Sequence, residues 1–213
     1  PYDPNKDFTY VAMLANTPTV LAVGADSPYR SLPELVDAAA VQADKIAFST
    51  AGEGSDNYQV LELLQQATGV KMLHVPYKSG NESLTAVMSR NTDVTAVSAV
   101  TAVGFIEAGQ IRPFAVTSSR RLANLPDIPT VKEVLGKEAE GGSLSGIAVP
   151  AATPAEIVAR LNAAISVVAA SPSVQEKIYA RGSEPVDRSQ EAFARKVVEE
   201  QKKWAGILAG VRK

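Results

Sequence analysis

The chain has 213 residues, of which 46% are hydrophobic and 21% are charged, so it is long enough to bury a core. Its formal net charge is -2 and its Lys and Arg residues are scattered, which argues against nucleic acid as a partner. The absence of cysteine excludes disulfides, thiolate metal sites and cysteine nucleophiles, and no apolar run approaches the roughly 18 residues that cross a bilayer.

Apolar runs of strand length alternate with stretches of helical periodicity from about Phe8 to Val149, an order typical of an α/β protein with a parallel sheet. Ser31 and Thr153 each precede a proline and a glutamate at capping spacing, so we expect both to begin helices. We expect strands at 8–14, 19–25, 45–49, 71–75, 94–97, 111–117 and 143–149.

The predicted elements divide unevenly between two lobes. Residues 20–117 supply enough strands and helices for a complete lobe, whereas residues 1–19 and 118–213 supply mainly helices. We therefore expect this second lobe to be partial, lacking its N-terminal strands, and to expose apolar surface. The segment 124–142, rich in Pro, Gly and charge, is expected to connect the lobes.

The segment from Thr50 to Ser55 passes from an apolar strand through Ala51, Gly52, Glu53 and Gly54 into an amphipathic helix. Glycines let the backbone approach a ligand, and the free N–H groups of a first helical turn favour an anion. We expect this turn to hold a carboxylate, with hydroxyl donors from Thr50 and Ser55. Alternatively, the glycines permit a tight turn and Ser55 or Asp56 caps the helix.

Several charged and aromatic side chains lie near this turn in the predicted fold, and we expect different roles for them. Glu53 and Asp56 would repel a bound carboxylate, so we expect them to face solvent, or else one of them to meet a cationic or hydroxyl group of the ligand. Tyr77 and Lys78 follow the next strand and could line the same site, although Lys78 could instead stabilise its turn. His74, within that strand, is expected to be a packed imidazole.

A third strand end carries Ser98 and Thr101, whose hydroxyls could reach the ligand or could cap the following helix. The sequence offers no nucleophile with its base, no carboxylate pair at catalytic spacing and no nucleotide-binding fingerprint. We therefore expect neither an enzyme nor a cofactor.

Several ordered landmarks resemble the Bug or TctC family, the periplasmic receptors of tripartite tricarboxylate transporters, and the resemblance spans the whole chain. The landmarks are Tyr2-Asp3-Pro4, Lys6-Asp7-Phe8, Ser31-Leu32-Pro33-Glu34-Leu35, the Gly52-Glu53-Gly54 turn, His74-Val75-Pro76-Tyr77-Lys78, Ala108-Gly109, Ala115-Val116-Thr117-Ser118, Leu125-Pro126-Asp127-Ile128-Pro129-Thr130-Val131 and Pro150-Ala151-Ala152-Thr153-Pro154.

This resemblance implies an α/β, two-lobed fold of the periplasmic-binding-protein type II class, with one lobe complete and a further N-terminal portion in family members. It also implies that strand-to-helix turns of both lobes hold the ligand carboxylate. Tyr58 stands where the family commonly has histidine. Val97 and Ser98 stand where many relatives have Asp-Asn, which argues against an amino-acid ligand.

The resulting hypothesis is an extracytoplasmic solute-binding protein that captures a small organic carboxylate for a tripartite transporter. Its expected partners are that ligand and membrane permease subunits, and its expected location is the periplasm, with a signal peptide outside the covered sequence. A two-lobed sensory or effector-binding module is the alternative. A hydrolase or isomerase on a similar fold is disfavoured by the shortage of titratable groups.

Overall fold

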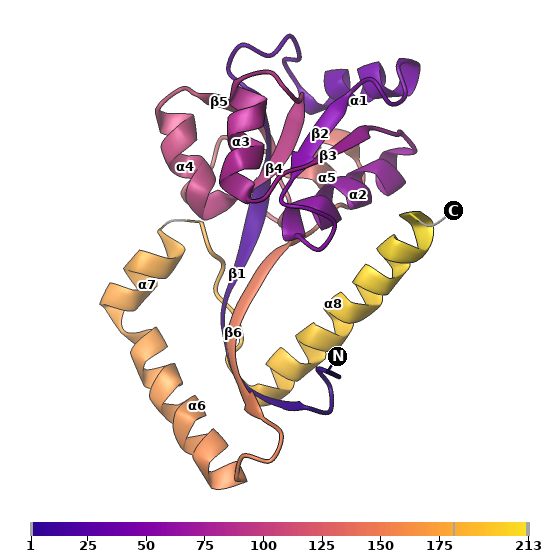
Figure 1. Ribbon diagram of the computed structural model, residues 1–213. Coiled ribbons are helices and arrows are strands. Elements are labelled where there is room, and N and C mark those ends of the chain that lie inside the picture. The colour runs from indigo at the N-terminus through magenta and orange to yellow at the C-terminus, as the bar shows by residue number, and fades with distance from the viewer. Residues whose placement is uncertain (1, 181, 212–213) are drawn as a thin grey trace. The chain divides into compact units, whose positions relative to one another are not determined.

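The computed structural model describes residues 2–180 and 182–211 (Figure 1). The chain forms two compact units, Thr17–Ser143 and Pro1–Asn16 with Leu144–Lys213. From the sequence we expected residues 118–143 to belong to the second, partial lobe instead. The interpretation of the two units as lobes stays a prediction.

The unit Thr17–Ser143 is a sheet covered by helices. It takes the second part of β1 (Phe8–Gly24) and then follows the order α1 (Leu32–Val41), β2 (Ala47–Thr50), α2 (Asp56–Thr68), β3 (Leu73–Pro76), α3 (Gly80–Met88), β4 (Val94–Ser98), α4 (Ala99–Glu107), β5 (Ile111–Val116) and α5 (Val131–Leu135).

The sheet is mixed, with strand order β3-β2-β4-β1-β5 and with β6 (Gly142–Pro150) paired to β1. β2 is parallel to β3 and β4, as expected, but β1 is antiparallel to β4 and β5. The expectation of two strands at 8–14 and 19–25 was wrong, because β1 is continuous through Pro18. The fixed φ of proline is compatible with extended backbone.

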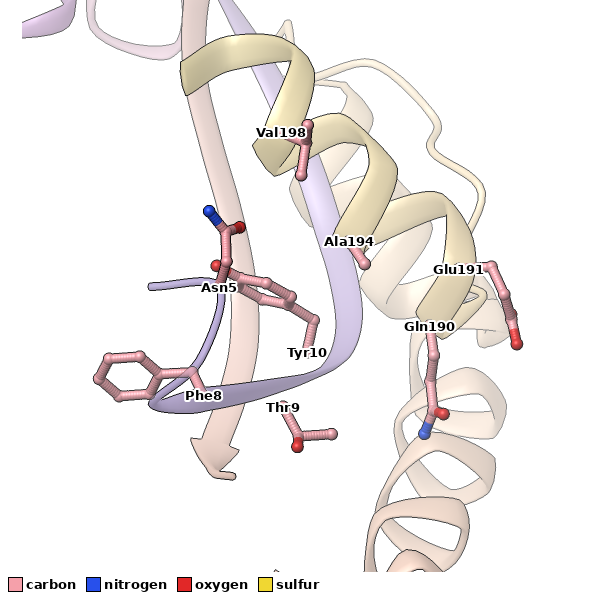
Figure 2. A pocket seen from close by; sticks show the side chains of 8 residues that line it. All are labelled: Asn5, Phe8, Thr9, Tyr10, Gln190, Glu191, Ala194 and Val198. Carbon is pink, nitrogen blue, oxygen red and sulfur yellow. The ribbon is translucent and has the colours of Figure 1, made fainter. Parts of the chain in front are cut away.

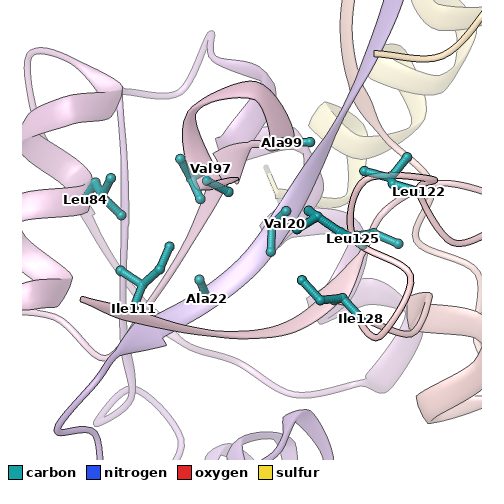
Figure 3. Packing of buried hydrophobic residues seen from close by; sticks show 11 residues of the cluster. Val20, Ala22, Leu84, Val97, Ala99, Ile111, Leu122, Leu125 and Ile128 are labelled. Carbon is teal, nitrogen blue, oxygen red and sulfur yellow. The ribbon is translucent and has the colours of Figure 1, made fainter. Parts of the chain in front are cut away.

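The core of this unit explains why residues 118–143 pack with it. Leu122, Leu125 and Ile128 are buried in the same cluster as Val20 (Figure 3). The amide of Val116 donates to the carbonyl of Pro129 at 2.8 Å, which ties the segment to the end of β5. Burial of three large apolar side chains contributes about 1.5–3 kcal/mol each, so this segment is part of the unit rather than a free connection.

Helices begin at both predicted places, but only one of the two expected caps is confirmed. Ser31 caps α1, and its side chain accepts from the amide of Glu34. Thr153 does not cap α6 (Ala155–Ala170), because the residue at the cap is Pro154, which has no side-chain acceptor. The amide of Thr153 donates to the carbonyl of Pro150, so Thr153 belongs to the preceding turn.

The unit Pro1–Asn16 with Leu144–Lys213 contains the first part of β1, most of β6, α6, α7 (Pro172–Tyr179) and α8 (Gln190–Val211). α8 packs on β1 through the rings of Phe193 and Tyr10, whose centroids are 4.9 Å apart. The helix α6 is tied to β1 by Asn162, which donates to the carbonyl of Val11 at 2.7 Å.

This unit also exposes apolar side chains, as the sequence predicted. Along α6, Val168 is 60% exposed and Ile157 and Leu161 are each more than a third exposed.

Across residues 2–180 and 182–211 no single helix has the length and apolarity of a membrane span. The pair α6 and α7, bent by 78°, has the length and composition of a span when the two helices are taken together.

Candidate functional site

Three strand-to-helix turns lie along one edge of the sheet in the unit Thr17–Ser143. The parallel strands β3, β2 and β4 are neighbours, and each continues directly into a helix, namely α3, α2 and α4. At this edge Ser98 at the end of β4 pairs with Thr19 of β1. The topology therefore brings together the three segments that the sequence singled out, at the sheet edge where ligands of open α/β sheets collect.

The hydroxyls of Thr50 and Ser55 are used inside the turn. Thr50 is 0% exposed, and its Oγ1 accepts from the amide of Gly52 at 3.0 Å. Ser55 Oγ donates to the carbonyl of Gly52 at 2.5 Å and accepts from the amide of Tyr58 at 3.3 Å. These hydrogen bonds engage both hydroxyls within the turn, so their expected role as ligand donors stays a prediction, and they confirm that Ser55 caps α2.

The backbone of the turn supplies the available donors instead. In the described part of the chain the amides of Glu53, Gly54 and Asp56 make no hydrogen bond. The amide of Ala51 donates to Asn57 Oδ1 at 3.3 Å, so Ala51 supports the turn. Because three free N–H groups lie at the positive end of the α2 dipole, this turn can bind an anion.

The glycines leave the turn open. Gly52 has φ +100, a backbone conformation that favours glycine. A Cβ built on Gly52 or on Gly54 would meet no atom within 4 Å. The space above the free amides is therefore accessible to a ligand.

The two carboxylates of the turn differ in their surroundings. Glu53 is exposed, as expected. Asp56 is half-buried, and its Oδ1 accepts from the amide of Asn57 at 2.9 Å, so it contributes to the cap. Glu53 is therefore the carboxylate free to repel or to contact a ligand.

Tyr58, in the first turn of α2, is buried, and its expected role in ligand contact stays a prediction. Its side chain is 3% exposed, and its ring centroid is 4.8 Å from that of His74 and 6.4 Å from that of Phe48. Burial, with the carboxylates of Glu62 and Glu53, raises the pKa of Tyr58 to about 12. The phenol is therefore neutral and part of the core.

The expectation that His74 is a packed imidazole is confirmed. Its ring stacks on Phe48 at a centroid distance of 4.9 Å, and its Nε2 lies 2.6 Å from Thr50 Oγ1. Burial lowers the pKa of His74, while the carboxylate of Glu53 acts in the opposite direction. The neutral imidazole is thereby favoured.

The turn after β3 uses backbone atoms for its own stability. The amide of Tyr77 donates to the carbonyl of Thr50 at 2.8 Å, and the amide of Lys78 donates to Glu82 Oε2 at 3.3 Å. The Lys78 side chain is exposed, and its ammonium forms no ion pair within residues 2–180 and 182–211. A cation is thus left available near the end of β3.

The turn after β4 leaves its hydroxyls unoccupied. Ser98 is the cap residue of α4 but its side chain makes no capping hydrogen bond, and Thr101 lies in the first turn of that helix. Neither hydroxyl has a hydrogen-bond partner among the residues that the structure describes. Of the four hydroxyls predicted for the site, these two are available to donate.

Two further backbone donors, at the start of α3, were not predicted from the sequence. Ser79 caps α3, and the amides of Gly80 and Asn81 in its first turn have no hydrogen-bond partner in the described chain. The spacing of Ser79 and Glu82, typical of a capping box, is the signal that could have located this second helix start.

A separate pocket lies in the other unit and contains none of the predicted site residues. It has a volume of about 500 Å³ and lies between the start of β1 and α8 (Figure 2). Its lining consists of Asn5, Phe8, Thr9, Tyr10, Gln190, Glu191, Ala194 and Val198.

Comparison with known proteins gives a family match along almost the whole chain. The family model described as "Tripartite tricarboxylate transporter family receptor", TctC, matches residues 1–212. A UPF0065 protein from the tcbD-tcbE intergenic region of Pseudomonas sp. (strain P51) is 31% identical over 213 residues, which are 100% of this chain and 63% of that protein. The first curated relatives are longer, since the chain spans 61–63% of their length.

Solved structures match the fold closely. An R. palustris protein with adipate is 31% identical with a TM-score of 0.87, over 97% of this chain and 69% of that chain. MatC from Rhodopseudomonas palustris with bound malate is 29% identical with a TM-score of 0.85, over 97% and 71%. The periplasmic binding protein BugD is 27% identical with a TM-score of 0.87, over 98% and 71%. These matches confirm the α/β, periplasmic-binding-protein-like fold class.

Proposed function

The chain belongs to the tripartite tricarboxylate transporter receptor family, and from this premise we propose that it holds a small organic carboxylate at the turn between β2 and α2. The observation that carries the proposal is that three amides at the start of α2, from Glu53, Gly54 and Asp56, have no hydrogen-bond partner among the residues that the structure describes. Backbone N–H groups at a helix start bind anions through hydrogen bonds and the helix dipole together.

The neighbouring turns supply further donors to the same edge of the sheet. The hydroxyls of Ser98 and Thr101 and the ammonium of Lys78 have no partner in the described chain. Tyr77 is half-buried beside Lys78, where its ring can limit access of water to a bound ligand. The adipate and malate in the two R. palustris structures support a carboxylate as the ligand class.

We infer the biological setting from the family. We expect reversible binding without chemistry, delivery of the ligand to membrane permease subunits, and a periplasmic location like that of BugD. Calorimetric titration of the protein with mono-, di- and tricarboxylates tests the ligand class. Binding of a neutral solute together with failure of every carboxylate would overturn the proposal.

A pair of substitutions at position 56 tests the amide donors directly. Asp56 is the first residue of α2, where proline is well tolerated, and Ser55 before it has the extended backbone that proline requires, at φ -89 and ψ 155. Asp56→Pro deletes one free N–H, whereas Asp56→Ala retains it. Because a hydrogen bond to a charged group is worth about 1.5–3 kcal/mol, we expect carboxylate affinity at least about 10-fold weaker in Asp56→Pro than in Asp56→Ala.

The alanine variant is the reference because both variants lose the same carboxylate and the same hydrogen bond to Asn57. Equal affinities in the two variants would show that the Asp56 amide does not contact the ligand.

A further inference from the structure

His74 is joined to the anion-binding turn by a short hydrogen-bonded chain. The imidazole lies on β3 opposite Phe48 of β2, and its centroid is 4.9 Å from the ring of Phe48 and 4.8 Å from that of Tyr58, which are themselves 6.4 Å apart. These two aromatic contacts, one stacked and one tilted, restrict the orientation of the imidazole. In this orientation its Nε2 lies 2.6 Å from Thr50 Oγ1.

Thr50 connects the imidazole to the conformation of the turn. Its Oγ1 accepts from the amide of Gly52, and the carbonyl of Gly52 accepts from both the amide and the hydroxyl of Ser55. Gly52, at φ +100, is the residue at which the chain changes direction before the free amides. The direction of those amides therefore depends on how Gly52 is held.

The hydrogen-bond donor and acceptor capacity of the Thr50 hydroxyl indicates which nitrogen of the His74 imidazole carries the proton. The hydroxyl is fully buried and has one hydrogen, and the Gly52 N–H already occupies one lone pair of its oxygen. Among the described residues, His74 Nε2 is the acceptor within reach of that hydrogen. A buried hydroxyl hydrogen without an acceptor is destabilising, so Nε2 should be unprotonated and the proton should be on Nδ1.

We propose that His74 is a positioning residue whose neutral imidazole accepts the Thr50 hydroxyl hydrogen and so holds Gly52 in the conformation that presents the amides of Glu53, Gly54 and Asp56 to an anion. The effect on affinity rests on the proposed function, whereas the hydrogen-bonded chain itself does not.

The charged groups around His74 are consistent with this state. Burial lowers the pKa of His74, and Glu53 on the turn opposes that shift in part. From α2, Tyr58 faces the ring as a neutral phenol and the carboxyl of Glu62, whose pKa is raised by burial, lies next to Tyr58. Since the folded form favours neutral His74, its stabilising contribution is present above pH about 6.5 and is lost as pH falls through the lowered pKa.

A double-mutant cycle tests the coupling. His74→Phe keeps an aromatic ring next to Phe48 and Tyr58 but removes the acceptor. Thr50→Val removes the hydroxyl at similar volume, and Thr50→Ser retains it. With adipate and malate as probes, we expect His74→Phe and Thr50→Val each to weaken binding about 3- to 10-fold. The double variant should bind no more weakly than either single variant, and Thr50→Ser should bind like the parent protein.

Hydrogen exchange of the Gly52 amide in the ligand-free protein gives a second measurement. We expect faster exchange in His74→Phe and in Thr50→Val, with Thr50→Ser close to the parent, provided that all variants show cooperative unfolding. Unchanged exchange in His74→Phe, or effects of the two single variants that add fully, would overturn the inference. If the parent binds no carboxylate, the proposed function fails while the exchange measurement still decides the role of His74.

Discussion

At position 53 a negative charge lies beside the amides that we assign to anion binding. The Glu53 side chain is exposed, and its backbone amide is one of the three free donors. Two unit charges about 4 Å apart in water repel each other by about 1 kcal/mol, and the repulsion falls with distance and salt. Glu53→Gln should therefore strengthen carboxylate binding by up to about 5-fold in calorimetry at low salt.

Glu107→Gln is the matched control, because Glu107 is an exposed glutamate at the far end of α4. It should leave the affinity unchanged. Weaker binding in Glu53→Gln would mean that this carboxylate contacts a cationic or hydroxyl group of the ligand instead.

Tyr58 makes the stability of the protein sensitive to alkaline pH. Its folded pKa is raised to about 12, mainly by burial, compared with about 10 in an unfolded chain. The folded state therefore keeps a proton that the unfolded state loses, so stability should decline as pH rises from about 10 to about 12. Urea unfolding across this range should show a steeper decline for the parent than for Tyr58→Phe, and parallel declines would contradict the assignment.

At the scale of single residues, the sequence predicted roles that depend on nearby residues better than roles that depend on tertiary contacts. The cap at Ser31 and the packed imidazole of His74 follow from nearby residues and from one strand, and both are confirmed. The roles of Thr50 and Tyr58 depend on His74, which is distant in sequence and reaches them through the pairing of β2 with β3. The Ser and Thr residues at the strand ends predicted where hydroxyl donors lie. They did not predict which of these hydroxyls make hydrogen bonds within the protein and which do not.

Within the turn between β2 and α2 the two glycines should respond differently to alanine. Both positions face open space, but Gly52 has φ +100 and Gly54 does not adopt a positive φ. Gly52→Ala should lower the free energy of unfolding by about 1–2 kcal/mol through backbone strain, whereas Gly54→Ala should change it by less than about 0.5 kcal/mol. Chemical denaturation of both variants measures the difference, and equal losses would contradict the strain argument.

Strand direction was one part of the fold that the sequence did not predict. Alternating strand and helix patterns correctly indicated the parallel strands β3, β2 and β4, because each is followed by a helix. β1 precedes this series and enters the sheet from the opposite edge, pairing Thr19 with Ser98. Apolar periodicity indicates that a strand is buried but contains no information on its direction. β1 was therefore expected to run parallel to its neighbours.

Across the whole molecule, apolar surface is unequally distributed between the two units. The unit Thr17–Ser143 buries a continuous cluster that extends over β1, β4 and β5 to Ile128. In the other unit Ile157, Leu161 and Val168 recur at helical spacing along α6 and are all partly exposed. Such a stripe of apolar side chains on one helix face can form a contiguous apolar patch, unlike a single exposed valine.

Replacing two residues of this stripe tests whether it behaves as a patch. Leu161→Gln with Val168→Gln keeps good helix formers in α6 and should markedly lower the fluorescence of the neutral dye Nile red bound to the protein. Val41→Gln is the control, since Val41 ends α1 in the other unit and is 85% exposed. It should leave the fluorescence unchanged because one apolar side chain is too small to hold the dye. An equal loss in the control would show that the dye reports total exposed apolar area rather than the α6 stripe.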